Sequence, residues 1–427
     1  MTDRVHDRSD SDDSSAAPQV VQRDATKSRD AQPAELHPIA RLPDEWITVL
    51  QSWGERPFRA RQVFRWIHAR GVTEPTLMTD LSKSLRARLK EDGIGTVSEL
   101  DEVRTAADGT RKLLLRLSDG RRVECVLIPM TDGGADADDW DSLDDAGSVS
   151  EEESDFEPLS GGEQLAARIV QSSQDKKKRR VTLCVSTQHG CAMGCVFCAS
   201  GRSGLGRGLG AAEIVGQVLE ARRHLASDEL LTNLVFMGMG EPLHHYDETA
   251  RAIRLLSEDD GVGLGLRRMT VSTVGLVRGI ERLGRDFDGK VGLAISLHAP
   301  NDELRSRLVP MNERIDLATL IGALQRYPLP RRRRITIEYI LIANVNDTRQ
   351  HAQELGRLLR PLRVKVNLIS MNPVEGTSLL GSSSEHVSQF RDWVASEGYS
   401  CFVRTRRGDE VSAACGQLAL RNPSAPR

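Results

Sequence analysis

The stretch RRVTLCVSTQHGCAMGCVFCASG, residues 179–201, joins a strand-like run to a loop that contains three cysteines. The run at 181–187, VTLCVST, consists mainly of β-branched and apolar residues, which favour a buried strand. The loop then places Cys191, Cys195 and Cys198 in the spacing C-x3-C-x2-C. Three thiols in one short loop directly after a strand indicate a metal centre rather than a chance grouping of buried structural cysteines.

The alternation of strand and helix continues downstream of this loop. Strand-like runs are followed by longer runs with helical spacing, such as AAEIVGQVLEARRHLA at 211–226 and DLATLIGALQRY at 316–327. Strands that alternate with helices predict parallel βαβ units. We therefore predict an α/β fold, a partial (β/α)6 barrel, with active residues in the loops where the strands end. The predicted strands are VTLCVST, LTNLVFMG, RRMTVST, VGLAISLH, RITIEYILI and VKVNLISM.

Bulk composition limits the class of protein. The 427 residues carry a formal net charge of -3, which excludes neither an acidic nor a basic partner. The start MTDRVHDRSDSDDSS has no apolar segment, and no run of about 18 apolar residues occurs, so we expect a cytoplasmic protein without a membrane span. The seven cysteines are an odd number and unevenly placed, which favours reduced, functional thiols over a disulfide framework.

Composition also divides the chain into segments. Residues 1–35 and 131–178 are rich in charged and small polar residues, so we predict a disordered tail and a disordered acidic insertion. Strand-like text on both sides of the insertion places it in a surface loop. The other predicted segments are a helical N-terminal accessory domain at 36–98, a β-rich linker at 99–130, the barrel with a C-terminal segment at 179–420, and a tail at 421–427.

The number of thiols narrows the type of metal centre. A structural zinc site takes four ligands, commonly as two separated pairs, and no second C-x2-C pair follows downstream. An ordinary ferredoxin-type cluster also uses four thiolates. Three thiolates on a 4Fe-4S cluster leave one iron open for a substrate or cofactor.

A C-x3-C-x2-C loop after the first strand of such a barrel resembles the radical S-adenosylmethionine (SAM) superfamily, in which the open iron chelates the methionine part of SAM. Within that superfamily the chain resembles the RlmN/Cfr family of RNA methyltransferases, from about residue 40 to about residue 420 apart from the insertion. The matching text includes PFRARQVFRW, VECVLIP, CVSTQHGCAMGCVFCASG, MGMGEPL, VNLISMNP and RTRRGDEVSAACGQL. The ACGQL stretch, and a cysteine seven residues before the loop, make the resemblance specific to this family.

The resemblance implies a mechanism that consumes two SAM molecules and uses two further cysteines and a carboxylate. Carbon 2 of adenine is electron-poor and cannot attack a sulfonium methyl group, so the family first methylates a protein thiol, which matches Cys415 here. A SAM-derived radical then activates that methyl group. Cys184 matches the thiol that forms a disulfide with Cys415 as the RNA–protein adduct breaks down, and Glu124 matches the base for the ring proton. On spacing alone, Cys184 is typical of an inert core residue and Glu124 of an outward-facing strand carboxylate, and the resemblance reverses both interpretations. Cys125 and Cys401 match no functional position.

The resemblance also implies SAM contacts after four different strands. Gly240 and Glu241 lie in MGMGEP, where strand-end backbone can bind the ammonium group of the cofactor. Taken alone, a serine at a strand end is typical of a cap or turn, and His298 is equally typical of a satisfied core histidine. The matched cofactor residues are Gly240, Glu241, Ser272, Ser296, Leu297, His298 and Asn372, and the matched metal ligands are Cys191, Cys195 and Cys198.

The resemblance implies a substrate and partners as well. We expect an rRNA/tRNA adenine-C2 methyltransferase that acts on 23S rRNA and tRNA, receives electrons from a donor such as flavodoxin, and is monomeric. Arg331 to Arg334 and RTRRG at 404–408 add cationic groups that suit RNA phosphates, although a solvated loop explains the first group equally well. The alternatives are a Cfr-like enzyme that methylates carbon 8, a non-enzymatic Fe-S electron carrier, and a zinc-bound RNA-binding module. The electron carrier explains the cluster but not Cys184 and Cys415, and the zinc module explains the cysteines and arginines without SAM.

Overall fold

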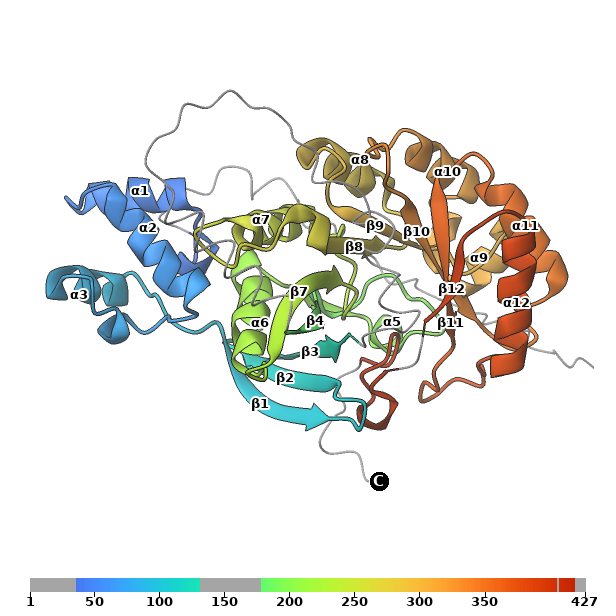
Figure 1. Ribbon diagram of the computed structural model, residues 1–427, viewed down its shortest axis with the longest axis horizontal. Helices are drawn as coiled ribbons and strands as arrows, with labels where there is room; N and C mark the ends of the chain where they lie inside the picture. The colour runs from blue at the N-terminus through green and yellow to red at the C-terminus, as the bar shows by residue number, and fades with distance from the viewer. Residues whose placement is uncertain (1–35, 131–177, 405–406, 419–427) are drawn as a thin grey trace, which may run out of the picture.

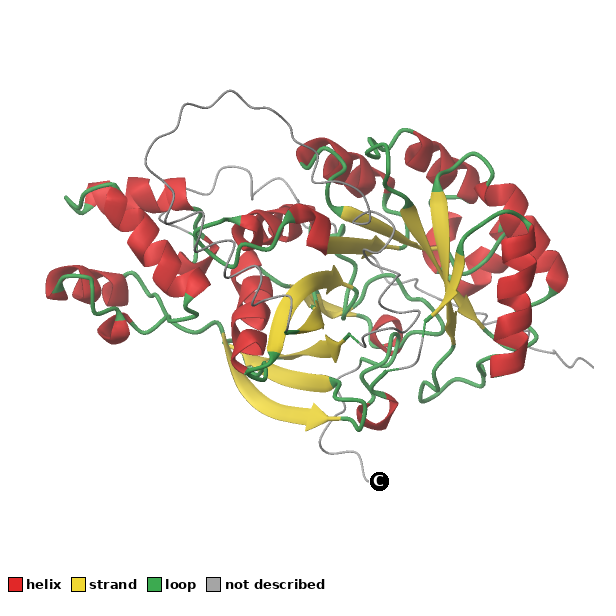
Figure 2. Cartoon of the chain, viewed as in Figure 1, coloured by secondary structure: helices red, strands yellow, loops and turns green. Residues whose placement is uncertain are grey.

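The computed structural model describes residues 36–130, 178–404 and 407–418 (Figure 1). The predicted tails at 1–35 and 421–427, and all but the last residue of the predicted acidic insertion, lie outside the described residues. The described part contains one long mixed sheet, one short β-hairpin, and helices that cover the sheet (Figure 2).

The long sheet confirms the predicted α/β fold. From β4 to β12, neighbouring strands pair in parallel and in chain order, which is the arrangement of an open β/α barrel. β1, β2 and β3 extend the sheet beyond β4 by antiparallel pairing. The sequence pattern does not predict β12, because three residues are too few to show alternation. The strands are β1 Ser98–Thr105, β2 Arg111–Leu117, β3 Arg122–Pro129, β4 Arg179–Cys184, β7 Glu229–Phe236, β8 Met269–Thr273, β9 Gly292–Ser296, β10 Ile335–Leu341, β11 Val364–Ser370 and β12 Cys401–Val403.

Helices connect the parallel strands and lie on the outer face of the sheet (Figure 1). Asp316, Thr348 and Ser383 each accept a hydrogen bond from the backbone N–H three residues on, which caps the helix that begins after them. Within the described ranges, no helix is long and apolar enough to cross a membrane. The helices are α6 Ala211–Arg223, α7 Tyr246–Ser257, α8 Val277–Asp286, α9 Asp302–Leu308, α10 Leu317–Gln325, α11 Arg349–Leu359 and α12 Ser384–Ser396, with short turns η5 Leu266–Arg268, η6 Pro310–Glu313 and η7 Asp409–Val411.

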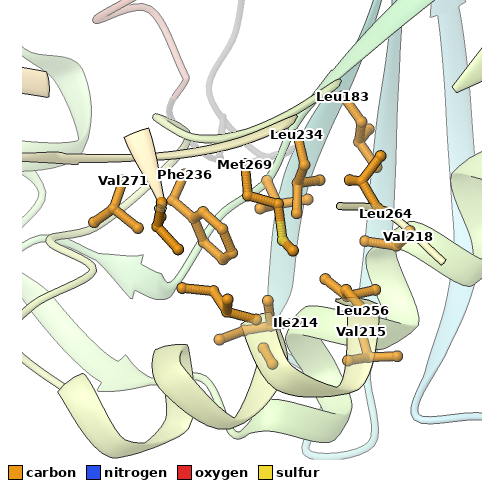
Figure 3. Close-up of a cluster of buried hydrophobic side chains, with 14 of the residues drawn as sticks. Leu183, Ile214, Val215, Val218, Leu234, Phe236, Leu256, Leu264, Met269 and Val271 are labelled. Atoms are coloured by element: carbon orange, nitrogen blue, oxygen red, sulfur yellow. The ribbon is translucent and has the colours of Figure 1, made fainter. Parts of the chain in front are cut away.

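An apolar layer between the sheet and α6 fixes which strand residues face the barrel interior. Figure 3 shows this layer. Burying one such side chain contributes roughly 1.5–3 kcal/mol relative to leaving it exposed. Successive residues of a strand face opposite sides, so Cys184 and Val235, next to Leu183 and Leu234, face inward. The layer contains Leu183, Leu234, Phe236, Met269 and Val271 from the strands and Ile214, Val215 and Val218 from α6.

The three cysteines lie in the connection of a small β-hairpin. β5, Gln188–Gly190, pairs with β6, Leu205–Gly208, in antiparallel register. The chain between these two strands contains the cysteine loop and the short helix α5, Ala199–Arg202. The two paired strands therefore hold both ends of the cysteine loop near the end of β4.

Short helical segments precede the sheet and are attached to the barrel helices. Arg222 of α6 donates to the carbonyl oxygens of His68 at 2.7 Å and Ala69 at 2.9 Å. Arg251 of α7 forms an ion pair with Glu45, with 2.8 Å between nitrogen and oxygen. These bonds join the N-terminal helices to the same side of the barrel as α6 and α7. The segments are η2 Pro38–Ala40, α1 Pro43–Ser52, α2 Phe58–Phe64, the π-helical turn η3 Arg65–Ala69, η4 Pro75–Leu77 and α3 Lys83–Glu91.

Candidate active site

A cavity of about 150 Å³ lies where the parallel strands end. Its walls come from the cysteine loop, from residues in and just after β7, β8, β9 and β10, and from the C-terminal segment after β12. This is the end of a β/α barrel at which active residues are expected. Of the residues predicted to be functional, the cavity is lined by Cys191, Cys195, Cys198, Gly240, Glu241, Ser272, Ser296, His298 and Cys415.

The thiols of the cysteine loop suit an iron–sulfur cluster. Cys191 and Cys195 are buried, Cys198 is half-buried, and burial raises the pKa of Cys191 to about 12. A thiol with that pKa stays protonated at neutral pH unless a metal replaces the proton. Among the described residues, no three His, Cys, Asp or Glu side chains converge on a single ion. A four-iron cluster binds each thiolate through a different iron, so its ligands stand apart around one cavity, as these do.

Backbone contacts hold the cysteine loop against its neighbours. Val196 donates its backbone N–H to the carbonyl of Leu308 at 3.2 Å, and Ala199 donates to the carbonyl of Gly416 at 2.8 Å. A Cβ atom on Gly201 would lie 2.9 Å from the backbone nitrogen of Cys195. The loop therefore needs glycine at position 201, and it contacts the C-terminal segment that carries Cys415.

Glu241 organises the strand ends around the cavity. Its carboxylate accepts backbone N–H bonds from Leu243 at 3.0 Å and from Val274, after β8, at 2.9 Å. Its own backbone N–H donates to Oε1 of Gln188 at 3.0 Å. Burial raises the pKa of Glu241 to about 7, although both backbone bonds favour the ionised form. Each carboxylate oxygen accepts one backbone bond, so the carboxylate ties the end of β7 to the segment after β8 and still has acceptor sites at the cavity.

The ends of β8 and β9 supply small polar groups. The hydroxyls of Ser272 and Ser296 lie 3.3 Å apart. His298 lines the cavity with a φ of +62°, and its Nδ1 accepts the backbone N–H of Ile340 at 3.1 Å. Burial lowers the pKa of His298 to about 3, so the ring is neutral and carries its proton on Nε2. Leu297 packs in the apolar core and does not line the cavity. Its backbone N–H donates to the carbonyl of Glu338 at 3.0 Å, and its carbonyl accepts from Arg305 at 3.2 Å.

The segment after β12 brings Cys415 to the cavity. Cys415 is half-buried, and its carbonyl accepts a hydrogen bond from Nδ2 of Asn372 at 3.1 Å. The hydroxyl of Ser200 donates to the carbonyl of Leu418 at 2.5 Å. Asn372 does not line the cavity, although it follows β11 as predicted. In this structure it positions the Cys415 segment.

Cys184 is the last residue of β4 and lies beside the same C-terminal segment. It packs in a small cluster that includes Val126 and Leu418. Burial, followed by the nearby Cys415 thiol, raises the pKa of Cys184 to about 12. Both cysteines are free thiols. The structure thus brings Cys184 and Cys415 into the same region, although Cys184 does not line the cavity itself.

Glu124 lines a second, larger cavity of about 490 Å³, which Ser412 and Gln417 of the C-terminal segment also line. Glu124 is only 5% exposed, so it is not a carboxylate on the outward face of its strand. Nζ of Lys112 lies 3.0 Å from Oε1 of Glu124 and also donates to the carbonyl of Ser412 at 3.2 Å. Ala199 and Gln417 line this larger cavity, while Cys198 and Gly416 line the smaller one.

Two cavity residues are missed by the sequence reasoning. Glu338 is buried in the middle of β10, and Arg404 follows β12 with a nitrogen 3.7 Å from its carboxylate. Oε1 of Glu338 also accepts a hydrogen bond from Asn367 at 3.2 Å. The position of Glu338 inside the apolar run ITIEYILI is unusual for a carboxylate, and this could have indicated a site residue from the sequence. Arg404, predicted as one of the cationic groups for RNA phosphates, lines the cavity and is only partly exposed.

The fold and this cavity define the class of protein: the chain is a radical SAM enzyme. The family profile described as "Radical SAM superfamily" matches residues 185–355. The profile described as "Ribosomal RNA large subunit methyltransferase N-terminal domain" matches residues 44–94. Enzymes of this superfamily use a 4Fe-4S cluster and SAM, which agrees with the thiols and strand ends described above.

Relatives identify the family more closely. The chain is 53% identical over 385 residues to a protein of Sorangium cellulosum named dual-specificity RNA methyltransferase RlmN, which covers 90% of this chain and 96% of the relative. A protein of the same name from Halorhodospira halophila is 42% identical and covers 86% of this chain and 88% of its own. The crystal structure of a radical SAM methyltransferase from Sphaerobacter thermophilus is 39% identical with a TM-score of 0.75, covering 90% of this chain and 99% of that one. The chain belongs to the RlmN family of radical SAM RNA methyltransferases.

Proposed function

We propose that this protein methylates carbon 2 of an adenosine in 23S rRNA and in tRNA, with Cys415 as the methyl carrier. The observation that supports this most is the position of Cys415, which lines one cavity with the three loop cysteines and lies beside the buried Cys184. The function of an electron carrier does not require two further thiols near the cluster. The function of a zinc-bound RNA-binding module does not require a cavity next to the cysteines. The names of the relatives favour RlmN-type carbon 2 chemistry over the Cfr-like alternative.

Most of the residues that would hold the cofactors line the smaller cavity. Cys191, Cys195 and Cys198 would hold the cluster. The strand-end residues Gly240 and Glu241, the hydroxyls of Ser272 and Ser296, and Nε2 of His298 line the cavity and would hold SAM. Leu297 and Asn372, which do not line the cavity, would support this site from behind its wall. When bound and reduced, the cluster and SAM supply a methyl group and a 5′-deoxyadenosyl radical.

The protein's own residues divide the remaining chemistry. Sγ of Cys415 accepts the methyl group, because a thiolate displaces a sulfonium readily. After that methyl group loses a hydrogen atom, its carbon bonds to carbon 2 of the adenine. Glu124 takes the proton from carbon 2 as a general base. The unpaired electron left by radical addition would return to the cluster. Sγ of Cys184, as a thiolate, then attacks Sγ of Cys415 to form a disulfide, and the electron pair of the broken bond stays on the transferred carbon, which takes up a proton to become the methyl group.

The two cavities suit the two kinds of ligand. The loop cysteines line the smaller cavity, while Glu124 lines the larger one together with Ser412 and Gln417 of the Cys415 segment. An adenine turned out of an RNA loop would enter the larger cavity, where Lys112 holds the carboxylate of Glu124 in place. Cys415 lines the smaller cavity and Gln417, two residues on, lines the larger one, so the segment with the methyl carrier borders both cavities.

Partners and location complete the proposal. The enzyme would receive electrons from a flavodoxin-like donor, act as a monomer and work in the cytoplasm. Exposed arginines of the N-terminal helices, such as Arg61 and Arg65, would contact RNA phosphates when released from Asp260, to which both are paired here.

Anaerobic reconstitution with transcripts of 23S rRNA and tRNA tests this function. Nuclease digestion and mass spectrometry should detect 2-methyladenosine in both RNAs. 8-Methyladenosine would instead support the Cfr-like activity, and unmodified RNA despite SAM cleavage would contradict both.

Glu124→Gln should still produce 5′-deoxyadenosine, but RNA methylation should fall by about 10²–10⁴-fold. Methylation by this variant at the wild-type rate would remove Glu124 from the mechanism.

A further inference from the structure

Arg305, on α9, is a fully buried cation whose hydrogen-bond acceptors are all neutral. Its side chain is 0% exposed. Its nitrogens donate to the backbone carbonyls of Leu297 at 3.2 Å, Val274 at 2.5 Å and Ser296 at 3.5 Å, and to the amide oxygen of Asn312 at 2.9 Å. No carboxylate of the described chain lies within ion-pair distance of it. A buried charge without a partner is strongly disfavoured, so Arg305 needs negative charge from elsewhere.

The nearest acid is kept off the guanidinium by an amide. Asn312 accepts from Arg305 through Oδ1 and donates through Nδ2 to Oδ1 of Asp302 at 2.9 Å. The Asp302 carboxylate also accepts the backbone N–H of Leu317 at 2.9 Å. An aspartate at position 312 would pair directly with Arg305, but the chain has asparagine there. The local structure therefore preserves the positive charge rather than neutralising it.

The positive charge lies behind the wall of the cluster cavity. Val274 and Ser296, whose carbonyls Arg305 binds, both line that cavity. Burial lowers the pKa of Arg305 to about 10, so the group stays charged at neutral pH. Through these two carbonyls the guanidinium is held at the wall of the same cavity that the three loop cysteines line.

We propose that Arg305 is the fixed counter-charge of the iron–sulfur cluster and stabilises its reduced form. The inference rests on the proposed function, in which Cys191, Cys195 and Cys198 hold the cluster. Three thiolates make that assembly anionic, and reduction adds one further electron. A permanent cation in the same low-dielectric interior lowers the energy of the more negative state, and net charge is one of the factors that set cluster potentials. Arg305 is a positioning and tuning residue, since it acts through the cavity wall.

A reduction titration of the cluster, followed by electron paramagnetic resonance without SAM or RNA, tests the inference. Arg305→Gln removes the charge, and Arg305→Lys keeps it while losing the planar fork. At the wild-type midpoint, the ratio of reduced to oxidised cluster should fall about tenfold in Arg305→Gln, which is about 59 mV for one electron. It should change little in Arg305→Lys. A fully loaded Arg305→Gln protein with the wild-type midpoint would overturn the proposal.

A second variant covers the possibility that Arg305→Gln does not fold. The double variant Asp302→Asn with Asn312→Asp keeps Arg305 and the total charge, but places a carboxylate where the Asn312 amide oxygen lies 2.9 Å from the guanidinium. Its midpoint should fall towards that expected for Arg305→Gln, and an unchanged midpoint would contradict the proposal. Loss of iron in Arg305→Gln but not in Arg305→Lys would also support a charge role, while loss in both would indicate a purely structural one. A wild-type protein that binds no iron would instead refute the cluster assignment and with it the proposed function.

Discussion

At the scale of single residues, Cys184 and Cys415 differ in a way that suits two separate roles. Cys415 is half-buried at the edge of the cavity, and its backbone is held by Asn372. Cys184 is buried at the end of β4, and burial raises its pKa to about 12. An accessible thiol can accept a methyl group, whereas a buried, protonated thiol stays unreactive until a partner is brought to it.

This difference predicts opposite outcomes for two alanine variants. Cys415→Ala should form no RNA adduct, because the first methyl group has no acceptor. Cys184→Ala should accumulate protein covalently linked to RNA, because no thiol can release the adduct. The adduct would appear on a denaturing gel as a nuclease-sensitive mass shift when SAM and reductant are present. Cys125→Ala, which alters another buried free thiol, is the matched control and should turn over normally. Normal turnover by Cys184→Ala, or an adduct formed by Cys415→Ala, would reverse these roles.

The same scale shows which site residues a sequence can reveal. The loop cysteines and Cys415 lie in short, distinctive sequence motifs, so their roles can be predicted from the sequence. Glu338, Arg404 and Arg305 lie in separate elements, and only folding brings them around one cavity. Burial is also invisible in the sequence: RTRRG predicts exposed cations, but Arg404 turns inward towards Glu338.

At the scale of elements, the strand pattern predicts most of the sheet. Six runs of β-branched residues correspond to the parallel strands β4 and β7 to β11, because their alternation with helices is regular. The pairing of β1, β2 and β3 onto the β4 edge of the sheet could not be predicted, because the sequence of an antiparallel strand does not indicate which strand it pairs with. That pairing brings Glu124 to the site.

The cysteine loop depends on one close backbone approach, which predicts a sensitive position. In Gly201→Val, the added side chain meets the backbone of Cys195, 2.9 Å from the Cβ position, and the loop has to shift. Overpacking of this kind costs roughly 1–3 kcal/mol. We expect the variant to bind much less iron, measured together with its unfolding temperature. Gly95→Ala is the control, because a Cβ there meets nothing within 4 Å. Wild-type iron content in Gly201→Val would show that the loop tolerates displacement.

At the scale of the whole molecule, the acidic insertion joins the fold at the end opposite the active site. β3 ends at Pro129, which pairs with Val181 in antiparallel register, and Met130 donates to the carbonyl of Arg180 at 2.8 Å. These residues lie at the start of β4, whereas Cys184 and the cavity lie at its other end. The two chain ends that flank the insertion are therefore held next to each other by the sheet itself.

Because β3 and β4 already pair there, a short glycine-containing turn in place of residues 133–176 should preserve the fold and the chemistry. A shorter loop costs less closure entropy, and none of the residues assigned to catalysis lies in the deleted stretch. Iron content, reductive SAM cleavage and stability should all stay near wild type, with stability within about 0.5 kcal/mol. Removing acidic side chains should also tighten RNA binding at low salt, and this difference should shrink as salt screens the charges. The pairing of β3 with β4 already holds together the two chain ends that the new turn joins, so the turn itself should not disturb the fold. A deletion protein that fails to fold or to bind iron would therefore show that the insertion supports the barrel.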